Sequence, residues 1–155
     1  MNVSKDDAYA ERIHRLFKKW PKWILTIVCL GIILWLTLAP HPLGEEELPL
    51  FPGADKIVHG LMFFCLALSL FFDALRSRGW RPLGLPLLAA LTIAAMLTGI
   101  AIECVQPLFG RSFEFWDMGA DAFGAVIAGG LWTIIGGSLG ITDGERRRLN
   151  QQDNR

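Results

Sequence analysis

The chain has 155 residues, of which 52% are hydrophobic, and its 15 basic and 15 acidic residues give a formal net charge of zero. Four apolar runs, each about 20 residues long, match the length that a bilayer demands and exclude an ordinary soluble domain. They cover residues 23–39, 57–75, 83–105 and 122–141. We therefore expect membrane lipids as the surroundings of the chain and no nucleic-acid partner.

The first segment of the chain, residues 1–22, is basic. Between residues 5 and 20 its apolar residues recur at the spacing of one helix face. This pattern predicts an amphipathic helix on the inner leaflet, where anionic lipid attracts basic side chains. A solvated tail that only sets orientation is the alternative. The predicted organisation is this segment, a four-span domain over 23–141, and a polar cytoplasmic tail over 142–155.

The first apolar run is predicted to stay in the mature protein, because no signal-peptide cleavage pattern follows it. Thirteen of the 15 basic residues lie before the first run, between the second and third, or after the fourth. Since cationic loops stay cytoplasmic, we expect an all-α, integral membrane four-helix bundle with both termini cytoplasmic. Only Lys56 and Arg111 depart from this distribution, and both lie in loops predicted to face outward.

The three cysteines, Cys29, Cys65 and Cys104, lie within or beside apolar runs. Their odd number and position favour apolar packing over a disulfide framework. In the fourth run, Gly124 and Ala128 form a pair of small residues four apart, which lets another helix approach closely. Packing within the chain is the preferred explanation, and a homo-oligomer is the alternative.

Polar residues gather at the predicted outer ends of the second, third and fourth runs. This set comprises Asp55, Lys56, His59, Glu103, Gln106, Arg111, Ser112, Asp117 and Asp121. Asp55 and His59 are four residues apart, as are Asp117 and Asp121, so each pair shares a helix face. Charged groups are costly when they face lipid, so we expect them to point inward at one depth. Arg111 is expected to pair with Glu103 or Asp117 through two parallel hydrogen bonds.

Each of these residues also has a simpler explanation. Asp55 and Asp117 suit helix N-termini, Lys56 can extend to the headgroups, and a loop serine such as Ser112 often caps a helix. His59 alone is commonly a packed histidine. A buried network that only holds three helix ends together accounts for the whole set. The convergence of the set on one side favours a functional site.

The segments ADKIVHGLMFF (54–64) and IECVQPLFGRSFEFWDMGADAFGA (102–125) resemble the VanZ-like family of small bacterial membrane proteins. The family pattern falls on Asp55, Lys56, His59, Glu103, Gln106, Gly110, Arg111, Ser112, Asp117 and Gly124. The resemblance covers residues 23–140, and Asp121 stands where the family usually has asparagine. A second acid there predicts crowding with Asp117.

The resemblance implies a multi-pass protein of the bacterial cytoplasmic membrane with a role in the cell envelope. The family is named for a protein linked to resistance to the glycopeptide teicoplanin. It supplies no settled reaction.

Two functions are predicted. In the first, the outer site binds or modulates an envelope amphiphile, such as a wall precursor or a lipid headgroup. Lys56 and Arg111 then hold phosphate or carboxylate. The other ligand-binding residues are Asp55, Gln106, Ser112 and Asp121.

In the second, the chain is a membrane enzyme that acts on a lipid-linked substrate. The catalytic residues are then His59, Glu103 and Asp117, with His59 as acid and base. No cofactor is expected. A metal variant with His59, Glu103, Asp117 and Asp121 as ligands is a less favoured alternative.

Overall fold

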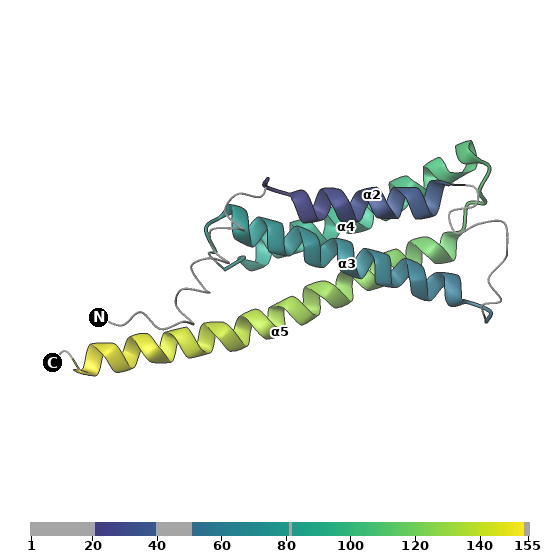
Figure 1. Cartoon of the computed structure of the whole chain (residues 1–155). Coiled ribbons are helices and arrows are strands. Elements are labelled where there is room, and N and C mark those ends of the chain that lie inside the picture. The colour runs from purple at the N-terminus through teal and green to yellow at the C-terminus, as the bar shows by residue number, and fades with distance from the viewer. Residues whose placement is uncertain (1–20, 40–50, 81, 154–155) are drawn as a thin grey trace.

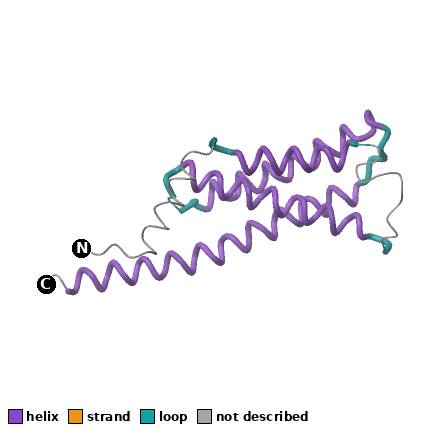
Figure 2. The backbone as a smooth tube through the Cα atoms, in the orientation of Figure 1, coloured by secondary structure: helices purple, strands orange, loops and turns teal. Residues whose placement is uncertain are grey.

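The computed structural model describes residues 21–39, 51–80 and 82–153, and all regular structure in these ranges is helical. The elements are α2 (Ile24–Leu38), α3 (Ala54–Ser77), α4 (Leu85–Val105), the 3₁₀ helix η1 (Gln106–Phe109) and α5 (Phe115–Asp153) (Figures 1 and 2). The predicted all-α class is confirmed. The predicted amphipathic helix before the first run lies outside the described residues.

Local sequence signals set several helix ends. Gly53, with φ of 86°, precedes α3 and supplies a left-handed conformation that most residues avoid. Pro86 lies in the first turn of α4, where its missing N–H has no helical partner to lose. Gly110, with φ of 76°, ends η1. These signals place the start of α3 and the end of α4 close to the predicted positions.

Three helical segments are long and apolar enough to cross a membrane: Ala54–Ser77, Leu85–Phe109 and Phe115–Ile135. Their most apolar windows are only 39%, 22% and 22% buried inside the protein, so most of their side chains face outward. The chain is therefore a multi-pass membrane protein. Helix α2 has 15 residues, which at about 1.5 Å per residue is shorter than a bilayer core of about 30 Å. The four-span prediction thus has three clear spans and one shorter apolar helix.

Helix α3 lies at the centre of the bundle, because it packs against α2, α4 and α5, most extensively against α5. Two apolar cores hold these helices together. The first joins α3, α4 and α5 and consists of Ala67, Phe71, Leu88, Ala95, Ala125 and Ala128. The second joins α2, α3 and α4 and consists of Ile33, Phe63, Leu66 and Ile102.

Helix α5 is longer at both ends than its predicted apolar run. Its apolar run was expected over 122–141, but the helix begins at Phe115 and continues to Asp153, through the segment predicted to be a polar tail. Figure 1 shows α5 crossing α3 and extending past the other helices at one end of the bundle. At the opposite end the start of α3, the end of α4 and the start of α5 meet, and there the predicted site residues lie.

Candidate functional site

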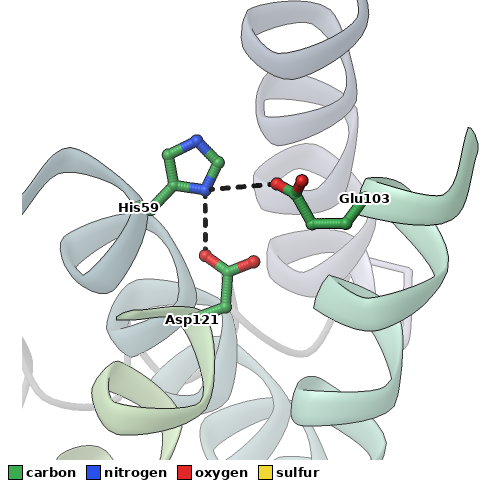
Figure 3. Close-up of side chains that lie close together, drawn as sticks. All are labelled: His59, Glu103 and Asp121. Carbon is green, nitrogen blue, oxygen red and sulfur yellow. Dashed lines mark hydrogen bonds and ion pairs between the residues drawn. The ribbon is translucent and has the colours of Figure 1, made fainter. Parts of the chain in front are cut away.

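Three buried ionisable side chains from three helices meet at this end of the bundle. His59 comes from α3, Glu103 from α4 and Asp121 from α5, and they are 8%, 0% and 1% exposed. The Nδ1 atom of His59 lies 3.1 Å from Asp121 Oδ1 and 3.9 Å from Glu103 Oε1 (Figure 3). We call these residues the buried triad. The predicted convergence of side chains from three helices is confirmed for them.

The Glu103 carboxylate is held by two further groups. Its Oε2 accepts a hydrogen bond from the backbone N–H of Glu114 at 3.2 Å. The amide of Gln106, when its nitrogen faces the carboxylate, donates to Oε2 at 2.9 Å and to Oε1 at 3.3 Å. In the opposite orientation that nitrogen reaches the carbonyl oxygen of Thr37 in α2 at 3.5 Å. The hydrogen-bond pattern favours the first orientation, so Gln106 helps to position Glu103.

A second group of charges, which we call the lysine cluster, lies nearer the helix ends. The Lys56 ammonium lies 2.7 Å from Asp55 Oδ2, 2.9 Å from Glu114 Oε2 and 2.8 Å from Asp117 Oδ1. An ammonium has three donors, and here each faces a carboxylate. This differs from the prediction that Lys56 would be available for phosphate, because the chain itself supplies its anionic partners.

His59 connects the two groups. Its Nε2 lies 3.8 Å from Asp117 Oδ2, while its Nδ1 forms the shorter contact with Asp121. The imidazole therefore stands between the two carboxylates that the sequence predicted to crowd each other. Glu103 and Asp117 were predicted to act together with His59, but the carboxylate at hydrogen-bonding distance from the imidazole belongs to Asp121.

Two predicted site residues have no side-chain partner in the described part of the chain. The backbone N–H of Arg111 donates to the Gln106 carbonyl at 3.2 Å, but its guanidinium forms no hydrogen bond or ion pair with the described residues. The predicted pairing of Arg111 with Glu103 or Asp117 is wrong. The Asp117 carboxylate forms an ion pair with Lys56 instead, and the Glu103 carboxylate accepts from the Gln106 amide. Ser112 is exposed, and its hydroxyl forms no hydrogen bond with the described residues either.

Two glycines allow the helices to bring the buried triad together. A β-carbon on Gly124 would stand 1.9 Å from the carbonyl oxygen of Gly60, the residue after His59. A β-carbon on Gly99 of α4 would stand 2.8 Å from Asp121 Oδ2. The prediction that Gly124 serves packing within the chain is confirmed. Gly99 leaves the space that the Asp121 carboxylate occupies.

Two sets of side chains have the spacing of metal ligands, with one ligand atom from each residue and all of these atoms within 4.8 Å of one another. One is the buried triad, and the other consists of Asp55, Glu114 and Asp117. The second set already surrounds the Lys56 ammonium. Among the described residues, no lysine or arginine forms an ion pair with the carboxylates of the buried triad.

Two residues with buried or clustered contacts were not predicted from the sequence. Glu114 was not assigned to the site, because its position in a predicted loop gave no helical spacing to relate it to Lys56. Asp73 was not singled out either, yet it is fully buried within α3, and its Oδ2 accepts from the Thr26 backbone N–H at 2.9 Å and hydroxyl at 3.0 Å. This contact holds the start of α2 at the end of the bundle away from the site.

Comparisons of this chain with protein-family models, with curated proteins and with solved structures find no match.

Proposed function

We propose that this chain is a VanZ-like protein of the bacterial cytoplasmic membrane that binds or modulates a cell-envelope amphiphile through its headgroup. The observation that carries the proposal is the meeting of the buried triad and the lysine cluster at one end of three apolar helices. A wall precursor or a lipid headgroup is the expected ligand. An effect on susceptibility to glycopeptides such as teicoplanin is the expected consequence in cells.

The side chains around this end of the bundle support a position at headgroup depth. Large aromatic side chains are exposed there, among them Phe115 at 69% and Trp116 at 73%. Aromatic rings, and indoles above all, favour the membrane–water interface. Half-exposed charges beside such rings are within reach of a headgroup, while the acyl chains of the ligand remain in the bilayer.

The charge of the site indicates which chemical groups of a headgroup it would bind. Among the described lysines and arginines, only Lys56 is paired with the site's carboxylates, and three carboxylates already surround it. Such an acid-rich site favours amines, hydroxyls and amides over an isolated phosphate. Arg111 remains the cation suited to an anionic part of the same headgroup, because a guanidinium binds phosphate or carboxylate through two parallel hydrogen bonds.

A purely structural network is less well supported than a binding site. In a network that only joins helices, we expect every buried polar atom to have a partner. Asp121 Oδ2 is buried and has no hydrogen-bond partner in the described structure. Asp73 Oδ1, at the opposite end of the bundle, also has no hydrogen-bond partner in the described structure, so the Asp121 oxygen supports a binding site only together with the charged side chains around it.

The contact between His59 and Asp121 favours a second candidate function, a membrane enzyme acting on a lipid-linked substrate. Asp121 fixes the imidazole through Nδ1, and Nε2 faces the more exposed lysine cluster. An oriented histidine of this kind can accept and return a proton. Turnover of a labelled envelope lipid by the purified chain would distinguish the enzyme from a binding protein.

The proposed orientation puts the site on the outer face and the loop between α3 and α4 in the cytoplasm. Arg76, Arg78 and Arg81 lie at this loop, and the positive-inside rule supports the assignment. Three further arginines, Arg146, Arg147 and Arg148, lie in the last part of α5, which ends at the same end of the bundle (Figure 1).

The variants Glu103→Gln and His59→Ala test the function in cells. In a strain whose teicoplanin susceptibility depends on this chain, we expect either variant to give the susceptibility of a strain that lacks the chain. Ser69→Ala is the control, because the Ser69 hydroxyl donates to the Cys65 carbonyl of its own helix, outside the site. Quantified membrane levels must match the parent chain. Full function with both variants at normal levels would reject the proposed site.

A further inference from the structure

The lysine cluster contains a permanent cation, the Lys56 ammonium, whereas the buried triad contains no lysine or arginine. Both sets carry carboxylates at the spacing of metal ligands. In the lysine cluster the Lys56 ammonium lies within 2.9 Å of all three carboxylates. In the buried triad, His59 is the sole basic partner of Glu103 and Asp121 among the described residues. Two fully buried carboxylates beside one imidazole leave negative charge that must be balanced.

Asp121 supplies a second, independent observation. Its side chain is 1% exposed, and its Oδ2 has no hydrogen-bond partner in the described structure. Gly99 leaves room for this oxygen, since a β-carbon there would lie 2.8 Å from it. Buried carboxylate oxygens are almost always satisfied. The site therefore has both an excess of negative charge and an acceptor without a donor.

The distances between the ligand atoms fit one bound metal ion. Two ligand atoms about 2.1 Å from a metal stand roughly 3.0–3.4 Å apart in octahedral or tetrahedral geometry. His59 Nδ1 is 3.1 Å from Asp121 Oδ1 and 3.9 Å from Glu103 Oε1, and the ligand atoms of the three residues lie within 4.8 Å of one another, so Glu103 has to move inward. We infer that the buried triad binds one divalent transition-metal ion through His59 Nδ1, Glu103 Oε1 and the Asp121 carboxylate.

The groups around the triad have the arrangement of a metal site's supporting contacts. Glu103 Oε2 accepts from the Glu114 backbone and, at the shorter of two distances, from the Gln106 amide, while Oε1 is the oxygen nearer His59. When Nδ1 binds a metal, the imidazole proton resides on Nε2, which faces Asp117 Oδ2 at 3.8 Å. Carboxylates in this position orient metal-bound histidines. The Nδ1 proton leaves to solvent, so binding weakens as pH falls.

The ligand set favours Zn²⁺. One imidazole with two carboxylates matches the donors that Zn²⁺ uses, and three protein ligands leave an open position. Mn²⁺ is the natural competitor, because it favours carboxylates more strongly. This inference goes beyond the proposed function, because it requires no amphiphile and can be tested on the protein alone.

The test is metal uptake by the full-length chain in detergent after tag removal and EDTA treatment. His14 and His41, the two other histidines of the sequence, are replaced by alanine to remove unrelated ligands. Zn²⁺ is added by equilibrium dialysis and counted by mass spectrometry, and tryptophan fluorescence follows the melting temperature. We expect one ion per chain and a melting temperature that rises with Zn²⁺ concentration.

Matched variants locate the ion. Glu103→Gln and Asp121→Asn should lower Zn²⁺ affinity at least about tenfold, whereas Glu114→Gln keeps it, because only the Glu114 backbone contacts the triad. Gly99→Ala retains every ligand but displaces the Asp121 carboxylate, and it should also weaken binding. Circular dichroism checks that each variant remains helical.

The inference is overturned if the helical parent chain takes up no Zn²⁺ or Mn²⁺, a result that needs no variant. It is also overturned if Glu103→Gln and Glu114→Gln bind equally well. Protons would then balance the charge of the buried triad.

Discussion

Gly124 of α5 lies directly against Gly60 of α3, so closely that a β-carbon on Gly124 would stand 1.9 Å from the Gly60 carbonyl oxygen. His59 precedes Gly60, and Asp121 lies one turn before Gly124. The contact between the two glycines therefore determines how near the imidazole can come to the Asp121 carboxylate.

Gly124→Ala should force the two helices apart. We expect a loss of about 1–3 kcal/mol in the free energy of unfolding, as is usual for overpacking, together with loss of the His59–Asp121 contact. The control is Gly130→Ala, whose β-carbon would meet no atom within 4 Å and which should be neutral or stabilising in a helix. Thermal unfolding in detergent compares the two. Equal melting temperatures would contradict the close approach.

Lys56→Met should destabilise the site end of the bundle, because three carboxylates lose their shared cation. Ion pairs with partly exposed groups contribute roughly 0.2–1 kcal/mol each, and the loss should shrink as salt concentration rises. Lys22→Met is the control, since the exposed Lys22 forms no ion pair within the described residues. Unfolding at low and high salt measures the effect. A loss that is the same for both lysines would argue against a specific cluster.

Asp73→Asn tests the end of the bundle opposite the site. Asp73 accepts two hydrogen bonds from Thr26, and weakening a buried charged acceptor should cost about 1–3 kcal/mol. Thr26→Val removes only the hydroxyl donor and should cost less. Chemical unfolding gives both values. Ligand and metal binding should survive in both variants, and a selective loss of binding in Asp73→Asn would show that the two ends are coupled.

The orientation of the chain can be measured by labelling single cysteines. In a background without Cys29, Cys65 and Cys104, a membrane-impermeant maleimide should label Ser112→Cys in intact spheroplasts. Gly84→Cys, in the loop between α3 and α4, should react only after permeabilisation. The reverse pattern would invert the topology and put the site in the cytoplasm.

Much of the site followed from helical spacing. His59, Glu103 and Asp121 each lie near the end of a strongly apolar run, where a charge must point into the bundle, so their convergence was predictable. The carboxylate that forms a hydrogen bond with His59 was not predictable. Whether Asp121, Glu103 or Asp117 comes closest depends on the approach of Gly124 to Gly60, and sequence spacing does not give that distance.

Contacts made through loops and helix ends were harder to predict. Glu114 precedes α5. Its contact with Lys56 depends on the path that η1 and the turn at Gly110 give the chain between α4 and α5. The helix itself begins at Phe115, earlier than the apolar run suggested. Asp73 was not predicted to be buried, because an acid is rarely buried within a span unless a hydrogen-bond donor such as Thr26 lies near it.

The central claim is that the buried triad and the lysine cluster form a ligand site. The most direct measurement is equilibrium binding of a labelled lipid-linked wall precursor to the full-length chain in nanodiscs. Saturable binding should be lost in His59→Ala and Asp117→Asn and kept in Ser69→Ala. Equal binding by the parent chain and by both helical site variants, or no saturable binding by the parent chain, would contradict the claim.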